Sequence, residues 1–214
     1  TGFGAHSKGA NPYALDGYKS MAVEILQDLG DVPDKIIFPV AGGDSLVGTW
    51  KGFVDLYDMK RIDKLPAMVA VEPIGPLTKS MAQNSQVPLE VEPEETVAFA
   101  VASVYGTYQA LKALYDSHGN AVTVKDPAIM RMQQRLAASE GMFAEPSSVM
   151  SVAAAEILSA EGKIKPDEKV VAVVTSSGLK ESESAARYLP ELPSVEPTLE
   201  SLKRGLQQSY NYTV

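Results

Sequence analysis

The sequence predicts an α/β protein with a doubly wound, mainly parallel sheet and flanking helices. Along the 214 residues, stretches with apolar side chains at helical spacing alternate with short, wholly apolar runs, as expected of successive βαβ units. Glycine and proline, which favour turns, bound the short runs. Because a strand buried on both faces reads as a continuous apolar run, these runs predict strands covered by helices on both sides.

The predicted elements follow one another in a regular order. Residues 18–29 carry apolar side chains at helical spacing, and Gly30 stands where a helix C′ residue belongs. Asp126 and Pro127 predict a helix start, with aspartate as the N-cap and proline at the first helical position. Residues 83–95 are polar and contain prolines, so we expect a surface excursion there. Strands are expected at 35–41, 67–71, 121–124 and 169–175, and further helices at 46–57, 107–116, 145–160 and 199–207.

Composition excludes several classes of function. The net charge is -8 and the isoelectric point is near 4.8, which argues against non-specific nucleic-acid binding, because that needs a basic surface. The chain has no cysteine, which excludes a disulfide scaffold and a cysteine nucleophile and fits a reducing cytoplasmic location. No apolar run reaches the roughly 20 residues of a membrane span. His6 and His118 lack carboxylates at ligand spacing, so no metal site is expected.

Three regions are expected along the chain. Residues 1–10 are Gly-rich and irregular and start at Thr1, so we expect a leader that enters from an upstream part of a longer gene product. A small natural protein that has lost its initiator methionine is the alternative. Residues 11–180 are expected to form the α/β domain, and residues 181–214 a polar tail with a helix.

A glycine-containing segment between a predicted strand and helix is the first candidate binding site. It consists of Ala41, Gly42, Gly43, Asp44 and Ser45. Glycines let the backbone turn tightly with its N–H groups inward, and a helix N-terminus adds partial positive charge, so a phosphate monoester could bind. No Lys-Ser/Thr pair follows the glycines, which suits a phosphate that is anchored rather than transferred. An ordinary turn between strand and helix is the alternative.

A cluster of hydroxyl side chains follows the last apolar run. Thr175, Ser176 and Ser177 stand there, before Gly178. Ligands of open α/β sheets bind beyond the carboxyl ends of the strands. A hydroxyl at this place could bind a heteroaromatic nitrogen or a carboxylate, and a turn that uses serine and glycine for its shape is the alternative.

The order of these segments resembles threonine synthase and its relatives, which are fold-type-II pyridoxal-phosphate enzymes. The similar stretches are NPYALDGYKSMAVEI, PVAGGDSLVGTWKGF with LPAMVAVEP, YQALKAL, EGMFAEPSS and KIKPDEKVVAVVTSSGLK. They occur in the family's order and cover most of residues 11–180. The resemblance implies a large-domain portion of such an enzyme, with pyridoxal 5′-phosphate as the cofactor of residues 11–180.

The resemblance also implies roles for particular residues. Residues 41–45 match the segment that wraps the cofactor phosphate in this family. Thr175 matches the hydroxyl that hydrogen-bonds the pyridine nitrogen, which stays unprotonated because a hydroxyl supplies no counter-charge. Glu145 and Pro146 match the start of a helix that borders the cofactor. A hydroxyl partner suits elimination and replacement rather than transamination.

The chain departs from the family pattern in three ways. The lysine that binds the cofactor covalently lies upstream in the family, so we expect no catalytic residue here and no activity from this chain alone. None of the following lysines has a comparable context: Lys8, Lys19, Lys35 and Lys51. Ala14 stands where threonine synthases usually carry an arginine that helps to hold the substrate phosphate. Residues 176–178 read Ser-Ser-Gly instead of the usual Gly-His-Gly.

These features predict part of a lyase or synthase that acts on a small amino-acid substrate. Threonine synthase, which converts O-phosphohomoserine to threonine and phosphate, is the leading candidate. Ala14 makes a cysteate-synthase-like β-replacement, or a serine/threonine or diaminopropionate ammonia-lyase, the runner-up. A non-catalytic phosphate- or nucleotide-binding module is the alternative from another class. The expected protein partners are the missing N-terminal portion and a second copy in a homodimer, with no nucleic acid or membrane.

Overall fold

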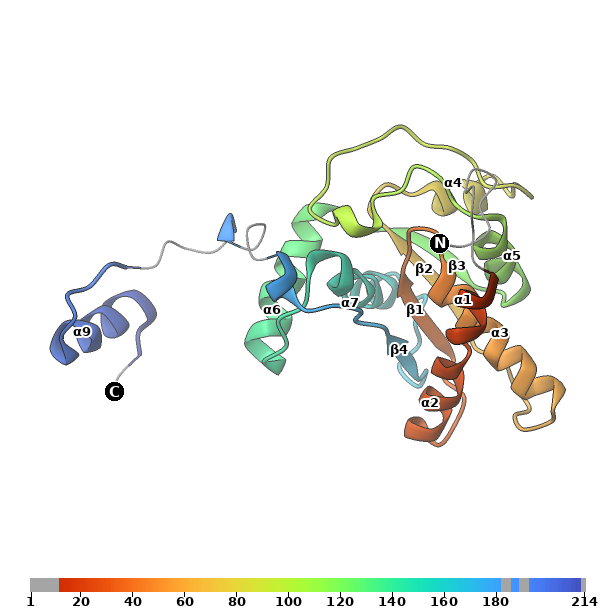
Figure 1. The fold of residues 1–214 in the computed structure, drawn as a ribbon, viewed down its shortest axis with the longest axis horizontal. Helices are drawn as coiled ribbons and strands as arrows, with labels where there is room; N and C mark the ends of the chain where they lie inside the picture. Colours follow the sequence, from red (N-terminus) through yellow and green to blue (C-terminus); the bar gives the residue numbers. More distant parts are fainter. Residues whose placement is uncertain (1–11, 182–185, 189–192, 213–214) are drawn as a thin grey trace. The chain divides into compact units, whose positions relative to one another are not determined.

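The computed structural model describes residues 12–181, 186–188 and 193–212 (Figure 1). It divides into two compact units, Thr1–Glu181 and Ser182–Val214. The predicted leader, with His6 and Lys8, lies outside the described residues. The first unit is an α/β structure with a parallel sheet between helices, so the predicted fold class is confirmed.

The sheet has four parallel strands in the order β3-β2-β1-β4. Strand β1 (Lys35–Pro39) pairs with β2 (Ala67–Glu72) on one side and with β4 (Val170–Ala172) on the other, and β3 (Asn120–Thr123) pairs with β2. The chain therefore adds β2 and β3 on one side of β1 and then returns to add β4 on the opposite side. In open α/β sheets, ligands bind outside the carboxyl ends of the strands where the strand order reverses, which here is between β1 and β4.

Helices cover both faces of the sheet (Figure 1). Successive side chains of a strand point to opposite faces, so Ile36 and Phe38 pack into one core and Ile37 into the other, all fully buried. The first face is covered by α1 (Pro12–Gly17), α2 (Ser20–Leu29), α3 (Asp44–Asp58) and α5 (Tyr108–Asp116), and the second by α6 (Asp126–Glu140) and α7 (Pro146–Ala160). The central strand is therefore buried on both sides, as its apolar sequence predicts.

The last strand differs from its prediction. The apolar run at residues 169–175 predicts a strand covered on both faces, but only Val170–Ala172 pair in the sheet and their side chains are half-buried. The physical reason is the strand order: within the described residues β4 lies at an edge and pairs with β1 alone. The predicted strand is thus confirmed over Val170–Ala172, and side chains of this run pack against both cores, but they are only partly buried.

The start of α6 also corrects the prediction. The helix begins at Asp126 itself, with Lys125 as the N-cap residue, so Pro127 is the second helical residue. The Asp126 carboxylate does not cap its helix. It accepts hydrogen bonds from the Thr96 hydroxyl at 2.6 Å and the Val97 N–H at 3.1 Å, and so ties the preceding loop to the helix.

A short helix, α4 (Pro76–Ala82), was not predicted. Its first turn is held by Glu72 at the end of β2, a carboxylate that is 1% exposed. Glu72 accepts hydrogen bonds from the N–H groups of Leu77 at 3.1 Å and Thr78 at 3.0 Å, and from the Thr78 hydroxyl at 3.1 Å. A buried acidic group thus joins the sheet to this helix.

Glu72 should make the stability of the fold depend on pH. Burial raises the pKa of Glu72, although hydrogen bonds from Thr78 and Leu77 oppose the rise. Because the folded pKa exceeds the unfolded one, the stabilisation is fully present below the unfolded pKa and is lost as pH rises through the folded pKa. We compare the thermal midpoints of the wild type and of a Glu72→Gln variant of the full-length protein. We expect the midpoint of the wild type to fall relative to that of the variant as the pH rises from the unfolded to the folded pKa of Glu72. A difference that does not change with pH would contradict the raised pKa.

The second unit contains helix α9 (Leu199–Tyr210), which confirms the predicted helix at 199–207 and extends it. Thr198 caps it, since its side chain accepts a hydrogen bond from the Ser201 N–H. Two further 3₁₀ turns, Phe99–Val101 and Gly178–Glu181, lie in the first unit.

Candidate functional site

The turn between β1 and α3 requires glycine at one position. Gly43 is the N-cap residue of α3 and has a φ of +87°, which L side chains rarely adopt. A Cβ atom added there would lie 2.7 Å from the Cβ of Ala110 on α5. Both the backbone conformation and the close packing therefore exclude a side chain, and α5 lies directly against the turn.

The same turn presents hydrogen-bond donors at its open side. Helix α3 has 15 residues, and its N-cap residue Gly43 has no side chain that could cap it. The first N–H groups of a helix have no partner within the helix. Ser45 adds a half-buried hydroxyl in the first turn. Such a set of donors, with the partial positive charge of the helix, suits a phosphate. Asp44 adds a carboxylate that the helix dipole favours but that a phosphate would repel unless it points away.

Thr107 fixes the turn from the start of α5. Its hydroxyl donates a hydrogen bond to the Gly42 carbonyl at 2.6 Å, and its oxygen accepts one from the Ala110 N–H at 3.2 Å. One side chain thus caps α5 and holds the glycine turn. Thr107 was not predicted as a site residue, although a threonine before a helical repeat is a typical N-cap signal.

We expect a Thr107→Val variant to lose both hydrogen bonds while keeping the shape of the side chain. Loss of an N-cap costs about 1 kcal/mol, and a loosened Gly42 turn should weaken phosphate binding about fivefold, the effect of one hydrogen bond. Equilibrium binding of the cofactor to the full-length protein measures this. The control is Thr49→Val, which removes a buried α3 hydroxyl whose hydrogen bond among the described residues goes to the Met21 sulfur, at 3.6 Å. Equal losses of affinity in both variants would contradict the role of Thr107.

The hydroxyl segment after β4 is held by the first turns of α7. The Ser148 and Thr175 hydroxyl oxygens lie 2.6 Å apart, and the Ser176 N–H donates to the Ser148 oxygen at 2.8 Å. The Ser151 hydroxyl donates to the Val173 carbonyl at 2.8 Å. Ser148 and Ser151 were not predicted as site residues, although Ser148 lies in the EGMFAEPSS stretch that carries the family resemblance.

The residues after Thr175 are held by packing contacts with residues 143–145. Ser177 bridges Ala144, and a Cβ added to Gly178 would lie 2.6 Å from the ring of Phe143. Glu145, the N-cap residue of α7, is buried, and its nearest cation is Lys180, with 3.9 Å between carboxylate oxygen and ammonium nitrogen. Thr175 itself is exposed and is free to face a ligand.

The strand order brings the two candidate segments to one place. Residues 41–45 follow β1 and Thr175 follows β4, and these strands are parallel neighbours, with the Val173 N–H donating to the Ile37 carbonyl at 2.9 Å. Both segments therefore lie at the carboxyl edge of the sheet, where the strand order reverses. Open α/β sheets bind ligands at such a place, and here it carries possible phosphate donors and an exposed hydroxyl.

The described lysines considered above are engaged elsewhere. Lys35 lies at the amino end of β1 and pairs with Glu168 at 2.6 Å. Lys19 pairs with Asp55 at 2.7 Å, and this hydrogen bond raises the pKa of Lys19. Lys51 lines a groove of about 320 Å³ between α3 and α5. None of these three extends from the carboxyl edge of the sheet.

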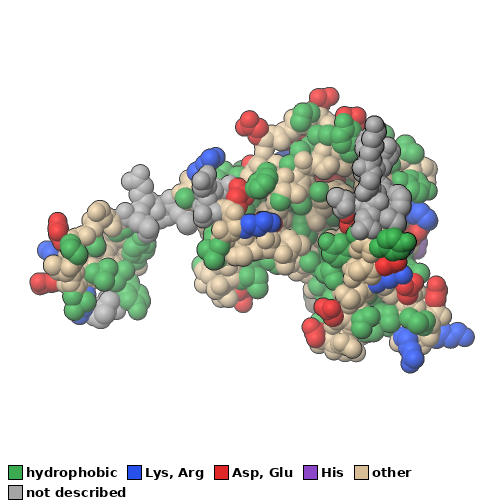
Figure 2. Space-filling model, viewed as in Figure 1, with side chains coloured by type: hydrophobic (Ala, Val, Ile, Leu, Met, Phe, Trp, Pro, Cys, Tyr) green, Lys and Arg blue, Asp and Glu red, His purple; other side chains and the backbone are tan. Residues whose placement is uncertain are grey.

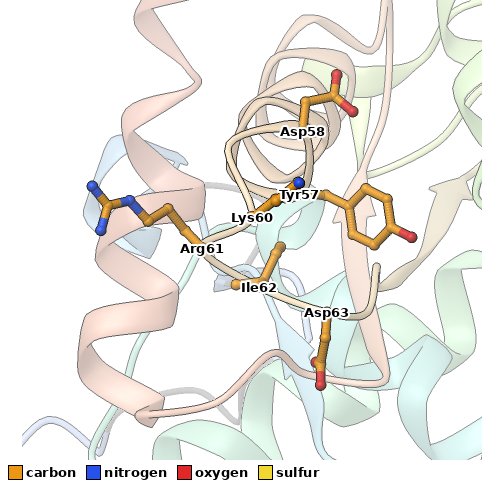
Figure 3. A pocket seen from close by; sticks show the side chains of 6 residues that line it. All are labelled: Tyr57, Asp58, Lys60, Arg61, Ile62 and Asp63. Carbon is orange, nitrogen blue, oxygen red and sulfur yellow. The ribbon is translucent and has the colours of Figure 1, made fainter.

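A hollow of about 840 Å³ lies at the other end of α3 (Figure 3). It is lined by Tyr57, Asp58, Lys60, Arg61, Ile62 and Asp63, and Arg61 extends away from Tyr57. Because α3 starts at the carboxyl end of β1, this hollow lies at the opposite end of the helix from the glycine turn. Its charged groups of both signs give it no clear preference for a phosphate.

The charge distribution and helix lengths add three observations. Figure 2 shows acidic and basic side chains interspersed across the visible face. Among the residues with described placement, no cluster of three or more His, Cys, Asp or Glu side chains could hold a metal ion. None of the described helices is long and apolar enough to cross a membrane.

Comparison with known sequences places the chain among cofactor-dependent enzymes. Residues 1–176 match the family described as "Pyridoxal-phosphate dependent enzyme". The chain is 34% identical over 203 residues to the threonine synthase of Methanocaldococcus jannaschii and 35% identical over 204 residues to that of Halalkalibacterium halodurans. Each alignment covers 92% of this chain, but only 50% and 55% of the respective relative. The chain thus spans about half the length of these curated relatives.

Comparison with solved structures shows the same fold. The processed form of threonine deaminase isoform 2 from Solanum lycopersicum matches with a TM-score of 0.67 and 20% identity, over 82% of this chain and 46% of that one. An L-serine ammonia-lyase from Rhizomucor miehei matches with a TM-score of 0.65 and 21% identity, over 81% and 56%. Since the family match extends over most of the sequence, the chain belongs to the family of pyridoxal-phosphate-dependent enzymes.

Proposed function

We propose that this chain is the cofactor-phosphate part of a lyase or synthase that acts on an amino acid and is most like threonine synthase. The full enzyme would convert O-phosphohomoserine to threonine and phosphate. The observation that carries the proposal is the placement of the glycine turn at residues 41–45 and of Thr175 beside one crevice, after neighbouring parallel strands. The similarity to threonine synthases over 92% of the chain supports it.

The residues at the crevice fit a phosphorylated heteroaromatic cofactor. Gly43 leaves room where a Cβ would collide with Ala110, so the turn can bring its N–H groups close to a phosphate. The Ser45 hydroxyl and the first N–H groups of α3 would hold the phosphate, and Thr175 would hold the ring nitrogen. When bound, pyridoxal phosphate withdraws electrons from the α-carbon of the substrate and stabilises negative charge there. Thr175 supplies a neutral hydrogen bond, and so leaves the ring nitrogen without a counter-charge.

The rest of the enzyme would come from outside this chain. The chain spans about half the length of its relatives, and Lys19 and Lys35 are engaged in ion pairs away from the crevice. We therefore assign the lysine that binds the cofactor to an N-terminal portion of the same protein. A homodimer and a cytoplasmic location are further parts of this proposal, the second supported by the absence of cysteine.

Product analysis with the full-length protein tests the proposed reaction. Release of phosphate and threonine from O-phosphohomoserine is expected, and the isolated 214-residue chain should give no turnover. Ammonia and a 2-oxo acid formed from serine, threonine or diaminopropionate would instead identify a lyase. That second candidate is favoured by Ala14, which removes an arginine fork for the substrate phosphate.

The cofactor itself is tested by absorbance. The full-length protein purified with pyridoxal phosphate should show a visible absorbance band that borohydride bleaches. A full-length protein without such a band would contradict an enzyme of this family and leave a non-catalytic phosphate-binding module as the explanation.

A further inference from the structure

Ser148 lies directly behind Thr175 and is fully buried, with 0% of its surface exposed. Its hydroxyl oxygen has two neighbours among the described residues, the Thr175 hydroxyl at 2.6 Å and the Ser176 N–H at 2.8 Å. The second contact has only one possible direction, because a backbone N–H can donate but cannot accept. The Ser148 oxygen is therefore already an acceptor toward Ser176.

The direction of the first contact follows from counting protons. If Thr175 donated to Ser148, the Ser148 proton would need another acceptor, and the hydrogen bonds of the described residues provide none. A buried donor without a partner is costly. If Ser148 donates to Thr175, the proton of the buried Ser148 hydroxyl has an acceptor. The proton of the exposed Thr175 is then available outside the pair.

The nearby hydroxyl of Ser151 does not disturb this arrangement. Ser151 directs its hydroxyl to the carbonyl oxygens of Ser148, at 3.1 Å, and Val173, at 2.8 Å. It thus holds the end of β4 against α7 without competing for either hydroxyl of the pair. The position of Thr175 is fixed by Ser151 through the backbone, while Ser148 contacts its side chain.

We infer that Ser148 is a positioning residue that sets the direction of the Thr175 hydrogen bond. By donating to Thr175, it turns that hydroxyl into a donor toward the crevice. The Thr175 hydroxyl can then donate a hydrogen bond to a ring nitrogen with a free lone pair. It disfavours a protonated ring nitrogen, which has no lone pair to accept that bond. This inference rests on the proposed function, because it takes Thr175 as the partner of the cofactor ring.

Nitrogen NMR of the cofactor in the full-length protein tests the inference. The protein is loaded with pyridoxal phosphate labelled with ¹⁵N at the ring, and the nitrogen resonance is followed as a function of pH. The wild type should show an unprotonated, hydrogen-bonded nitrogen. Thr175→Val should move the resonance to that of a nitrogen without a hydrogen bond, and Ser148→Ala should move it in the same direction. The cofactor dissociation constant of Ser148→Ala should rise about fivefold, as for one lost hydrogen bond.

Ser147→Ala is the matched control. Ser147 is a neighbouring serine of α7 with 2% exposure, and its side chain takes no part in the hydrogen bonds to Thr175 or Ser176 described above. In the Ser147→Ala variant, the resonance of the cofactor ring nitrogen should equal that of the wild type. If Ser148→Ala does not fold, Ser148→Cys retains a weak donor and should give a smaller shift in the same direction.

The outcomes separate the inference from the proposed function. If Thr175→Val shifts the resonance and both Ser148 variants do not, Ser148 has no positioning role, while Thr175 remains the ring partner. If Thr175→Val also leaves the resonance unchanged, the ring assignment within the proposed function fails. A protonated nitrogen in the wild type, or an equal shift in Ser147→Ala, would also overturn the inference.

Discussion

A Gly119→Ala variant is expected to lose at least about 3 kcal/mol of unfolding free energy, at the upper end of what overpacking costs. A Cβ atom at Gly119 would lie 1.8 Å from the Met68 carbonyl oxygen, which belongs to the backbone of β2 and cannot move alone. The surrounding turn is also fixed, because the Gly119 N–H donates to the Leu114 carbonyl at 2.8 Å and the Ser117 oxygen accepts from the Met68 N–H at 3.2 Å. Either the turn or the central sheet must shift.

Denaturant unfolding of the full-length protein measures this loss. Gly17→Ala is the control, since a Cβ there meets no heavy atom within 4 Å and the residue lies at the end of α1. That variant should remain within about 0.5 kcal/mol of the wild type, as is usual for surface substitutions. Equal unfolding free energies for Gly119→Ala and Gly17→Ala would show that the turn after α5 is less tightly packed than its backbone contacts indicate.

A Gly43→Ala variant is expected to bind pyridoxal phosphate about 100-fold more weakly, the effect of losing one strong hydrogen bond to a charged group. The new methyl group would collide with the Cβ of Ala110 and would force the glycine turn away from α5. The N–H groups at the start of α3 would then no longer converge on a phosphate. Equilibrium dialysis of the cofactor against the full-length protein measures the change.

Two further variants distinguish the effect of the collision with Ala110 from the effect of placing alanine at a positive φ. Gly30→Ala also places alanine at a positive φ, +66°, but without any neighbour within 4 Å; it should cost about 1 to 2 kcal/mol of stability and leave cofactor affinity unchanged. Adding Ala110→Gly to Gly43→Ala removes the colliding methyl group and should restore part of the affinity, beyond the sum of the single changes. Without such recovery, the collision with Ala110 cannot explain the weaker binding.

Much of the fold follows from local sequence, because it depends on residues close together in the chain. The repeat of residues 18–29 and Gly30 predicts α2 and its left-handed C-cap, which the structure has with a φ of +66°. The glycines before α3 likewise predict its start. In contrast, α4 depends on the buried carboxylate of Glu72 for its first turn, and a carboxylate at the end of an apolar run gives no sign that it will turn inward.

The candidate site could be predicted only in part, because some of its residues are held by contacts between distant parts of the sequence. Residues 41–45 and Thr175 are recognisable because each segment has its own local pattern. The residues that hold them are not, since Thr107 reaches Gly42 across 65 positions of the sequence and Ser148 reaches Thr175 across 27. Hydroxyl side chains are common on helices, and only the packing of α5 and α7 shows which of them are used. The incomplete burial of β4 is equally a property of strand order, which no single segment encodes.

The return of the chain to β1 has a consequence for folding. The glycine turn can form as soon as β1, α3, β2 and α5 have assembled, because Thr107 holds Gly42 across 65 positions of the sequence. The ring side of the crevice must wait for β4, whose first residue, Val170, pairs with Lys35. Closing so long a loop is entropically slow, so the chain would acquire its phosphate-binding half before its ring-binding half. A cofactor held by both would connect the earliest and the latest parts of the domain to fold, and would thereby oppose local opening of the edge strand.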